Sequence, residues 1–340
     1  MSASGTLTTE TPAALLRDRS RGRRLDPAVE WGLAGLAAFI LVLIAFFFVR
    51  LLIEAWPAFQ HEGLLQFVFG ADWVPSQGQF GALPLLFGTL VTSAVALLIG
   101  VPVAIATALY ITELAPNRVR APLMITVELL AAVPSVVYGL WGIQVLAPKL
   151  EPVEQWFSDT FSFLPLVGGQ VSIPNYFVTG LILAIMIVPI VSAISREVMT
   201  TVPADHKEAA LALGATRWEM IRMAVLPYAR AGISGAAMLG LGRAIGETIA
   251  VTIVIGNAPD IGDTIFSQGY TLAAVIANEF GEAASDPTHR AALIAAGLVL
   301  FVLTLIVNAA ARYFVVRGSR GQRAASGDAA TAAAAAGVGG

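Results

Sequence analysis

The chain has 340 residues, of which 57% are hydrophobic and only 13% are charged, and its mean hydropathy of +0.77 excludes an ordinary soluble globular protein. It contains no cysteine, which excludes disulfides and thiolate metal sites, and its three histidines lie far apart in the sequence. The formal net charge of −3 says little by itself, because basic and acidic residues are sorted by region. We therefore expect an integral membrane protein without a metal site.

Six apolar segments are long enough to cross a hydrocarbon core of about 30 Å, which takes roughly 20 helical residues. In chain order they lie near residues 32–53, 83–111, 123–146, 176–195, 231–256 and 291–316. The predicted fold class is therefore all-α, a polytopic membrane protein with six transmembrane helices. Six crossings return both termini to the same side of the membrane.

The arginines predict which side that is. They lie before the first span, between the second and third, across residues 196–230, and after the last span. The loops on the opposite side, 57–82, 147–175 and 257–288, contain Lys149 as their only basic residue. By the positive-inside rule, both termini and the loop after the fourth span are cytoplasmic. The outward loops contain Gly, Pro, Trp and Phe, which predicts short packed elements rather than independent domains.

The predicted transmembrane domain covers residues 29–317. Residues 1–28 and the Ala/Gly/Ser-rich residues 318–340 are expected to be disordered cytoplasmic tails. A signal peptide is the alternative for the N-terminus, but the apolar run is too long and no small-residue cleavage site follows it before Arg50.

A polar segment at about residues 201–227 separates the fourth and fifth spans. Pro203, two acidic residues in the first turns and Gly214 as a left-handed stop predict a short helix over residues 203–213. Thr216 and Glu219 have the spacing of a capping box, which predicts a second helix. The residues expected on the apolar face of that helix are Trp218, Ile221, Val225 and Tyr228.

The fifth span carries two charged residues. Arg243 lies near the midpoint, about 18 Å from either predicted end at 1.5 Å per residue. A charge there costs about 3 kcal/mol on insertion scales, so it should face a cavity or a partner rather than lipid. At four residues further on, Glu247 shares a helix face with Arg243 and is the expected partner. Gly240, Gly242 and Gly246 would let a neighbouring backbone or a substrate come close.

Two interpretations of this pair stay open. It can be an internal ion pair that fixes helix packing, or Arg243 can offer its planar fork of donors to two oxygens of a tetrahedral oxyanion in a transport pathway. In the pathway, Glu247 would either neutralise Arg243 or accept a hydrogen bond from a protonated phosphate oxygen. Glu128, near the cytoplasmic end of the third span, is expected to be an interfacial or helix-paired carboxylate.

The polar segment resembles the EAA loop of ABC-importer permeases. The residues that match its pattern, and that the resemblance implies contact a partner ATPase, are Glu208, Ala209, Ala210, Gly214, Leu226 and Pro227. Ala224 stands where that loop usually has Ile. A DNA-binding helix-turn-helix is the alternative, but apolar segments of membrane-spanning length lie on both sides of this one.

The run G-L-G-R-A-I-G-E-T-I-A-V-T at 240–252 and the run V-P-S-V-V-Y-G at 133–139 resemble the PstC family, permease subunits of bacterial phosphate importers. This resemblance implies the type I ABC-importer permease fold (MetI-like) in the bacterial cytoplasmic membrane, with phosphate as substrate. It also implies a PstA-like permease subunit, two copies of a PstB-like ATPase and an external PstS-like phosphate-binding protein as partners.

An enzymatic function is not expected. The chain has no G-x-x-x-x-G-K-[ST] loop, and Lys149 and Lys207, its only lysines, follow Pro148 and His206. ATP and Mg would therefore be bound, and ATP hydrolysed, in the separate ATPase. Sulfate and molybdate permeases share the R-A-x-G-E core, so another oxyanion is an alternative substrate. A secondary transporter that uses Arg243 and Glu247 as an ion relay is a further alternative, which leaves the EAA-like loop unexplained.

Overall fold

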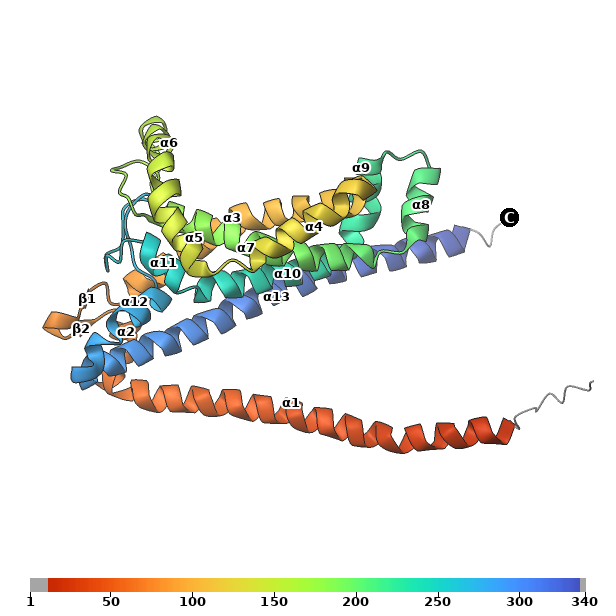
Figure 1. The fold of residues 1–340 in the computed structure, drawn as a ribbon, viewed down its shortest axis with the longest axis horizontal. Helices are drawn as coiled ribbons and strands as arrows, with labels where there is room; N and C mark the ends of the chain where they lie inside the picture. Colours follow the sequence, from red (N-terminus) through yellow and green to blue (C-terminus); the bar gives the residue numbers. More distant parts are fainter. Residues whose placement is uncertain (1–11, 337–340) are drawn as a thin grey trace, which may run out of the picture. The chain divides into compact units, whose positions relative to one another are not determined.

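The structure is a computed structural model that describes the backbone of residues 12–336 and the side chains of residues 29–313. The chain divides into two compact units, Met1–Ile53 and Glu54–Gly340, which are described separately. Helices make up most of the described chain (Figure 1), which confirms the predicted all-α class.

The first unit is the greater part of helix α1 (Pro12–Glu62). From Val29 onward this helix is long and apolar enough to span a membrane, and the predicted first span at 32–53 falls within it. The predicted disordered tails at 1–28 and 318–340 lie outside the residues whose side chains are described, and their disorder stays a prediction.

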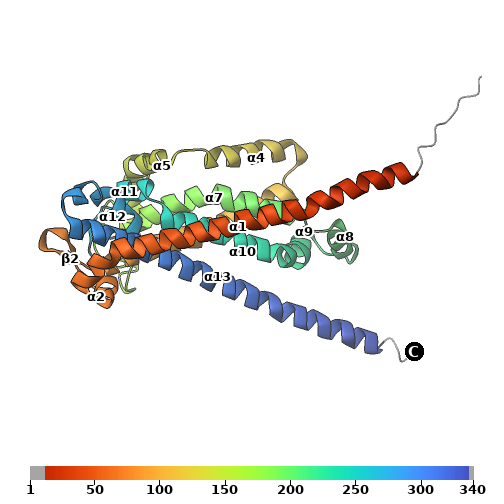
Figure 2. The ribbon, with the colours of Figure 1, turned by 90° about the horizontal axis from the view of Figure 1, so that it is seen from below.

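The second unit is built around four helices: α3 (Leu83–Leu109), α7 (Tyr176–Thr200), α10 (Leu226–Gly246) and α13 (Pro287–Ala336). Helix α10 packs against each of the other three, and α3 lies along α7. Figure 2 shows α7, α10 and α13 following one another across the bundle. Glycines allow this close packing. A Cβ on Gly180 would lie 2.5 Å from Cβ of Val95 in α3, a distance that a side chain could not tolerate.

The third predicted span, 123–146, is interrupted. Helix α4 (Asn117–Ala131) is followed after a bend of 89° by α5 (Ser135–Trp141), the π-helical segment η3 (Gly142–Leu146) and α6 (Ala147–Thr160). The bend falls at Pro134, which has no backbone N–H to donate and disfavours helical geometry at the residue before it. If this bent pair is counted as one span, the described residues contain the predicted six; the other five are single helices or continuous helical runs.

The fifth predicted span, 231–256, differs at both ends from the helices of the structure. Helix α10 stops at Gly246, Glu247 has an extended backbone with ψ 128°, and the chain resumes as the short helix α11 (Ile249–Val254). On the other side, α9 (Arg217–Met220), the π-helical segment η4 (Ile221–Val225) and α10 follow one another without a gap. The prediction of one continuous helix over 231–256 is therefore wrong.

The two interrupted spans meet. A Cβ on Gly139 of α5 would lie 3.1 Å from Cα of Ala250 in α11, so these short helices are packed backbone to backbone. Figure 1 shows α5 next to α11 at the end of the bundle from which α6 projects. The residues at the bend before α5 and at the break before α11 are thereby brought into one region.

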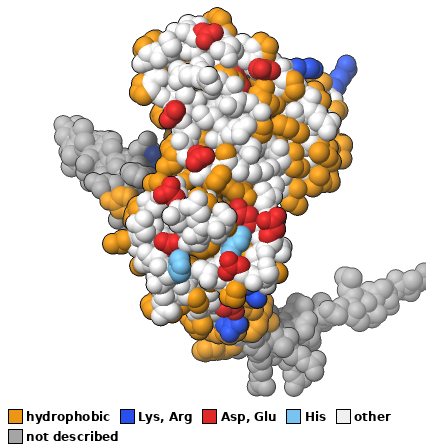
Figure 3. Space-filling view, turned by 90° about the vertical axis from the view of Figure 1, so that its left-hand side faces the viewer, with side chains coloured by type: hydrophobic (Ala, Val, Ile, Leu, Met, Phe, Trp, Pro, Cys, Tyr) orange, Lys and Arg blue, Asp and Glu red, His pale blue; other side chains and the backbone are white. Residues whose placement is uncertain are grey.

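Short elements cover the end of the second unit beside α11. They are α2 (Leu64–Phe69), β1 (Trp73–Val74), the 3-10 helix η1 (Pro75–Gln77), β2 (Gln79–Phe80), α12 (Leu272–Glu279) and the 3-10 helix η5 (Glu282–Ser285). Strand β1 pairs antiparallel with β2, Trp73 opposite Phe80, and the Trp73 indole donates to Glu279 at 3.0 Å. Figure 3 views this end, where acidic side chains are scattered and basic ones are few. Two of the loops predicted to face outward, 57–82 and 257–288, thus contain short packed elements, as predicted.

Candidate functional site

The polar segment between α7 and α10 forms two helices joined at a sharp corner. The first, α8 (Ala204–Ala212), begins after Pro203 as N-cap. Gly214 then takes the left-handed conformation with φ 86°, and the Ala215 N–H donates to the Ala210 carbonyl at 3.2 Å. The predicted helix over 203–213 and its left-handed stop are confirmed, with the ends shifted by one residue.

The capping box that starts the second helix is also present. The Glu219 N–H donates to Oγ1 of Thr216 at 3.3 Å, and the Thr216 N–H donates to Oε2 of Glu219 at 2.8 Å. The widened π turn η4 follows and ends just before Pro227. A proline at this position would clash with the carbonyl four residues earlier in a regular α-helix, and the wider turn accommodates it.

The π turn changes which side chains face inward. Ile221 and Val225 are fully buried, as predicted, but Trp218 and Tyr228 are 60% and 50% exposed. Their assignment to the buried apolar face is wrong. For Tyr228 the reason is that the prediction assumed an unbroken α-helical period, which η4 alters by one residue; Trp218 precedes η4 and lies in the first turn of α9. The buried cluster that holds this helix consists of Ala108, Leu109, Met199, Val202, Met220, Ile221, Val225, Ala229 and Ile233, with partly buried Ala210 and Leu226 against it.

Helix α8 has a different character, since none of its residues is fully buried. Glu208, Ala209 and Gly214 are exposed, and Leu213 beside them is 90% exposed. A groove of about 430 Å³ lies between α8 and the start of the next helix, lined by Asp205, His206, Ala209, Ala210, Leu213, Met223 and Ala224. An exposed leucine beside an apolar groove is the type of surface that a protein partner covers.

The six predicted coupling residues therefore divide into two groups. Glu208, Ala209, Gly214 and Pro227 are exposed, whereas Ala210 and Leu226 are half-buried against the cluster beneath. A Cβ on Gly214 would meet no atom within 4 Å, so the glycine is required by its positive φ rather than by lack of space.

The second candidate site is the cavity that Arg243 lines. This cavity is open to the surface of the chain, has a volume of about 580 Å³ and lies between α7, α10 and α13; its lining residues are Ile190, Gly235, Met238, Leu239, Gly242, Arg243 and Asn308. A Cβ on Gly242 would meet nothing within 4 Å, and the same holds for Gly246, while Gly240 is held against Val191 of α7. Of the three glycines, one serves helix packing and two leave open space beside Arg243.

The expected pairing of Arg243 with Glu247 is not found. The helix that would place them on one face ends at Gly246, and Glu247 instead accepts a 3.4 Å hydrogen bond from the Ala250 N–H at the start of α11. The ion pairs within residues 29–313 do not include these two side chains. Among residues 29–313, no carboxylate pairs with Arg243, whose side chain is exposed on the wall of this open cavity.

Tyr138 is a residue of this region that the sequence analysis did not single out. Its hydroxyl donates to the Leu130 carbonyl at 2.8 Å and so spans the bend between α4 and α5. The Arg243 guanidinium is near enough to act electrostatically on the phenol. The sequence signal that could have identified Tyr138 is its place four residues after Pro134, in one of the two runs that carry the family resemblance.

Glu128 lies away from this region. Its Oε1 is 2.9 Å from Nη2 of Arg196 in α7, which confirms the prediction of a helix-paired carboxylate.

Known proteins match the chain over most of its length. Residues 100–319 match the family described as binding-protein-dependent transport system inner membrane component. The phosphate transport system permease protein PstC of Mesorhizobium japonicum is 43% identical over 286 residues, which cover 83% of this chain and 87% of the relative. PstC 2 of Mycobacterium tuberculosis is 44% identical over 307 residues, 87% of this chain and 93% of the relative.

A crystal structure of a bacterial alginate ABC transporter with its alginate-bound periplasmic protein contains a chain of the same fold. The TM-score is 0.59 at 20% identity, over 86% of this chain and 97% of that chain. The fold is thus that of an ABC-importer permease. The family match makes the chain an inner-membrane transport subunit that works with other components. The chain belongs to the binding-protein-dependent transport system inner membrane components, and within them to the PstC permeases.

Proposed function

We propose that the chain is the transmembrane permease subunit of an ATP-driven importer that carries inorganic phosphate into the cytoplasm. The observation that carries this proposal is the identity of 43% to a phosphate transport system permease over 83% of the chain. The cavity beside Arg243 adds a chemical reason, because a guanidinium fork is suited to two oxygens of a tetrahedral oxyanion.

The interrupted helices support a substrate pathway at this place. In several transporter folds, substrates bind where spans are broken, because the break frees polar backbone groups inside the membrane. Here the break after Gly246 lies three residues beyond Arg243, and α5 and α11 pack together beside it. Because Glu247 is engaged at the start of α11, an anion can approach Arg243 without displacing a carboxylate.

The surface of α8 is the proposed contact with the ATPase, through Glu208, Ala209 and the Gly214 corner. Since α9, η4 and α10 are continuous, movement of the corner would tilt the helix that carries Arg243. The proposed partners are a PstA-like permease, two copies of a PstB-like ATPase, which binds ATP and Mg, and an external PstS-like phosphate-binding protein. The proposed orientation places both termini and α8 in the cytoplasm, as the distribution of arginines requires.

Labelled phosphate uptake by the complete importer in proteoliposomes, with ATP and without an ion gradient, tests this function. We expect uptake that excess sulfate does not reduce, and we expect Arg243→Gln to abolish it while the complex still assembles. Uptake that depends on an ion gradient would favour a secondary transporter, and competition by sulfate or molybdate would favour another oxyanion. Normal uptake by Arg243→Gln would exclude Arg243 from the pathway.

A further inference from the structure

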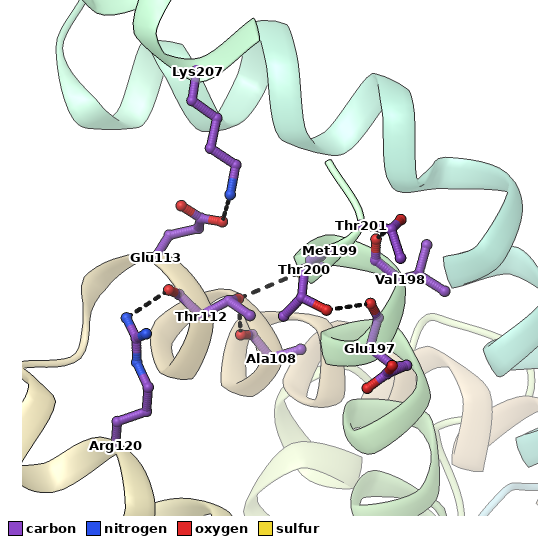
Figure 4. Close-up of polar contacts among 10 residues, drawn as sticks. All are labelled: Ala108, Thr112, Glu113, Arg120, Glu197, Val198, Met199, Thr200, Thr201 and Lys207. Atoms are coloured by element: carbon purple, nitrogen blue, oxygen red, sulfur yellow. Dashed lines mark hydrogen bonds and ion pairs between the residues drawn. The ribbon is translucent and has the colours of Figure 1, made fainter. Parts of the chain in front are cut away.

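An ion pair joins the exposed helix α8 to a distant part of the bundle. Nζ of Lys207 lies 2.6 Å from Oε1 of Glu113, although the two residues are 94 positions apart in sequence. Glu113 belongs to the π-helical segment η2 (Tyr110–Leu114), which continues α3. Figure 4 shows the two side chains pointing toward each other from these separate elements.

The pair is more buried than a typical surface ion pair. The side chain of Glu113 is 9% exposed and that of Lys207 is 23% exposed. Loss of one partner would leave the other charge partly desolvated and unpaired, which costs far more than loss of a surface pair. Geometry and burial together make this a specific contact between α8 and η2.

Few other contacts position α8. No α8 residue is fully buried, and besides Lys207 its described contacts with other elements include an edge-on approach of His206 to Tyr228 and the packing of Ala210 on the cluster below. A helix with so little burial gains little positional restraint from the hydrophobic effect. The ion pair is therefore a large part of what ties α8 to the spans.

The other end of the pair lies on a well-braced segment. The carbonyl of Thr112, next to Glu113, accepts a 2.8 Å hydrogen bond from Nη2 of Arg120 in α4. The Thr112 hydroxyl contacts Sδ of Met199, near the end of α7, at 3.8 Å. Figure 4 shows Lys207 of α8, Arg120 of α4 and Met199 of α7 around η2. A force on Glu113 would thus reach α4, which leads to the bend before α5.

We propose that the Lys207–Glu113 pair is a second mechanical link in the importer, in addition to the continuous chain from α9 into α10. Displacement of α8 by the ATPase moves η2 and α4 through this pair, and so acts on the α4–α5 side of the pathway. Lys207 and Glu113 are positioning residues that touch neither substrate nor nucleotide. The inference rests on the proposed function of α8 as the ATPase contact.

Charge reversal tests the link. In the complete importer in proteoliposomes, we expect Lys207→Glu and Glu113→Lys each to lower phosphate taken up per ATP hydrolysed by about fivefold or more, the lower end of typical coupling between sites. The double reversal should restore the ratio to within about twofold of the unmodified importer. If Lys207→Glu fails to assemble, Lys207→Met takes its place in the test, because it removes the charge and keeps the aliphatic stem. We expect Lys207→Met to lower the same ratio of phosphate taken up to ATP hydrolysed.

Arg196→Glu is the matched control. It reverses one charge of the Arg196–Glu128 pair, which has the same kind of geometry at 2.9 Å and joins α7 to α4 without involving α8. A ratio for Lys207→Glu equal to that of Arg196→Glu, or a double reversal that restores nothing, would overturn the link. A merely structural role would lower assembly or thermal stability and leave the ratio unchanged, which would overturn it as well.

A second measurement needs no substrate and so separates this inference from the proposed function. We expect ATPase binding to slow amide hydrogen exchange in η2 and α4 of the unmodified importer and of the double reversal, but not of Lys207→Glu. Equal slowing in all three would refute the link even if phosphate uptake is normal. If the unmodified importer takes up no phosphate, the proposed substrate fails while the exchange result still decides the link.

Discussion

Replacement of Gly214 by alanine isolates the backbone requirement of the α8–α9 corner. The residue has φ 86°, and a Cβ there would meet no atom within 4 Å, so alanine adds strain without a clash. An L-residue in the left-handed region costs roughly 1–2 kcal/mol. If the corner must keep this conformation to bind the ATPase, the competent population falls by a factor of about 5–30.

The assay is the affinity of the purified permease for its ATPase, measured by titration in detergent or nanodiscs. Gly281→Ala is the matched control, because Gly281 has φ −67° and a Cβ there would also meet no atom within 4 Å. Gly214→Asn should lose less affinity than Gly214→Ala, since asparagine tolerates the left-handed region. Equal affinities for the Gly214→Ala and Gly281→Ala proteins would refute the reasoning.

Two further predictions concern the spans. Gly240→Ala would place a Cβ 2.7 Å from Cγ2 of Val191, so we expect it to lower the free energy of unfolding by about 1–3 kcal/mol and to lower the Tm in detergent. Gly242→Ala is the control, because a Cβ there would meet no atom within 4 Å. An equal Tm for both variants would contradict the close packing at Gly240. Tyr138→Phe removes the 2.8 Å hydrogen bond to the Leu130 carbonyl. Loss of this hydrogen bond destabilises the bent conformation by about 1 kcal/mol, so phosphate uptake should fall about fivefold while the complex still assembles. An unchanged uptake rate would show that the bend does not need this bond.

The features that the sequence predicted well depend on neighbouring residues. The capping box needs only Thr216 and Glu219, and the left-handed corner needs only a glycine after a helix. The approximate positions of the spans follow from length and hydropathy, which lipid enforces regardless of packing. The cost of an isolated charge in lipid led to the expectation that Arg243 faces a cavity or a partner; in the structure it lines an open cavity, and its role in a pathway stays a prediction.

The features that it did not predict depend on tertiary packing. After Glu247 and Thr248 the chain continues with the apolar, helix-compatible residues 249–251, so the prediction carried the helix through Glu247, which is extended in the structure. The assumed ion pair with Arg243 failed for the same reason, since i and i+4 are neighbours only within an unbroken helix. Tyr228 was misassigned because one extra residue in a π turn shifts every later side chain around the axis, whereas Trp218 precedes that turn and lies exposed in the first turn of α9.

Two of the π-helical segments adjoin the same buried cluster: η2 directly follows its Leu109, and η4 contributes Ile221 and Val225 to it. Each holds one residue more than the α-helical turn it replaces. If such a turn tightens into α geometry, that spare residue is released and the helix beyond it rotates by about 100°, one residue's step around an axis of 3.6 residues per turn. Loss of the π turn at η4 would therefore turn every later side chain of α10, Arg243 included, around the helix axis without breaking the helix.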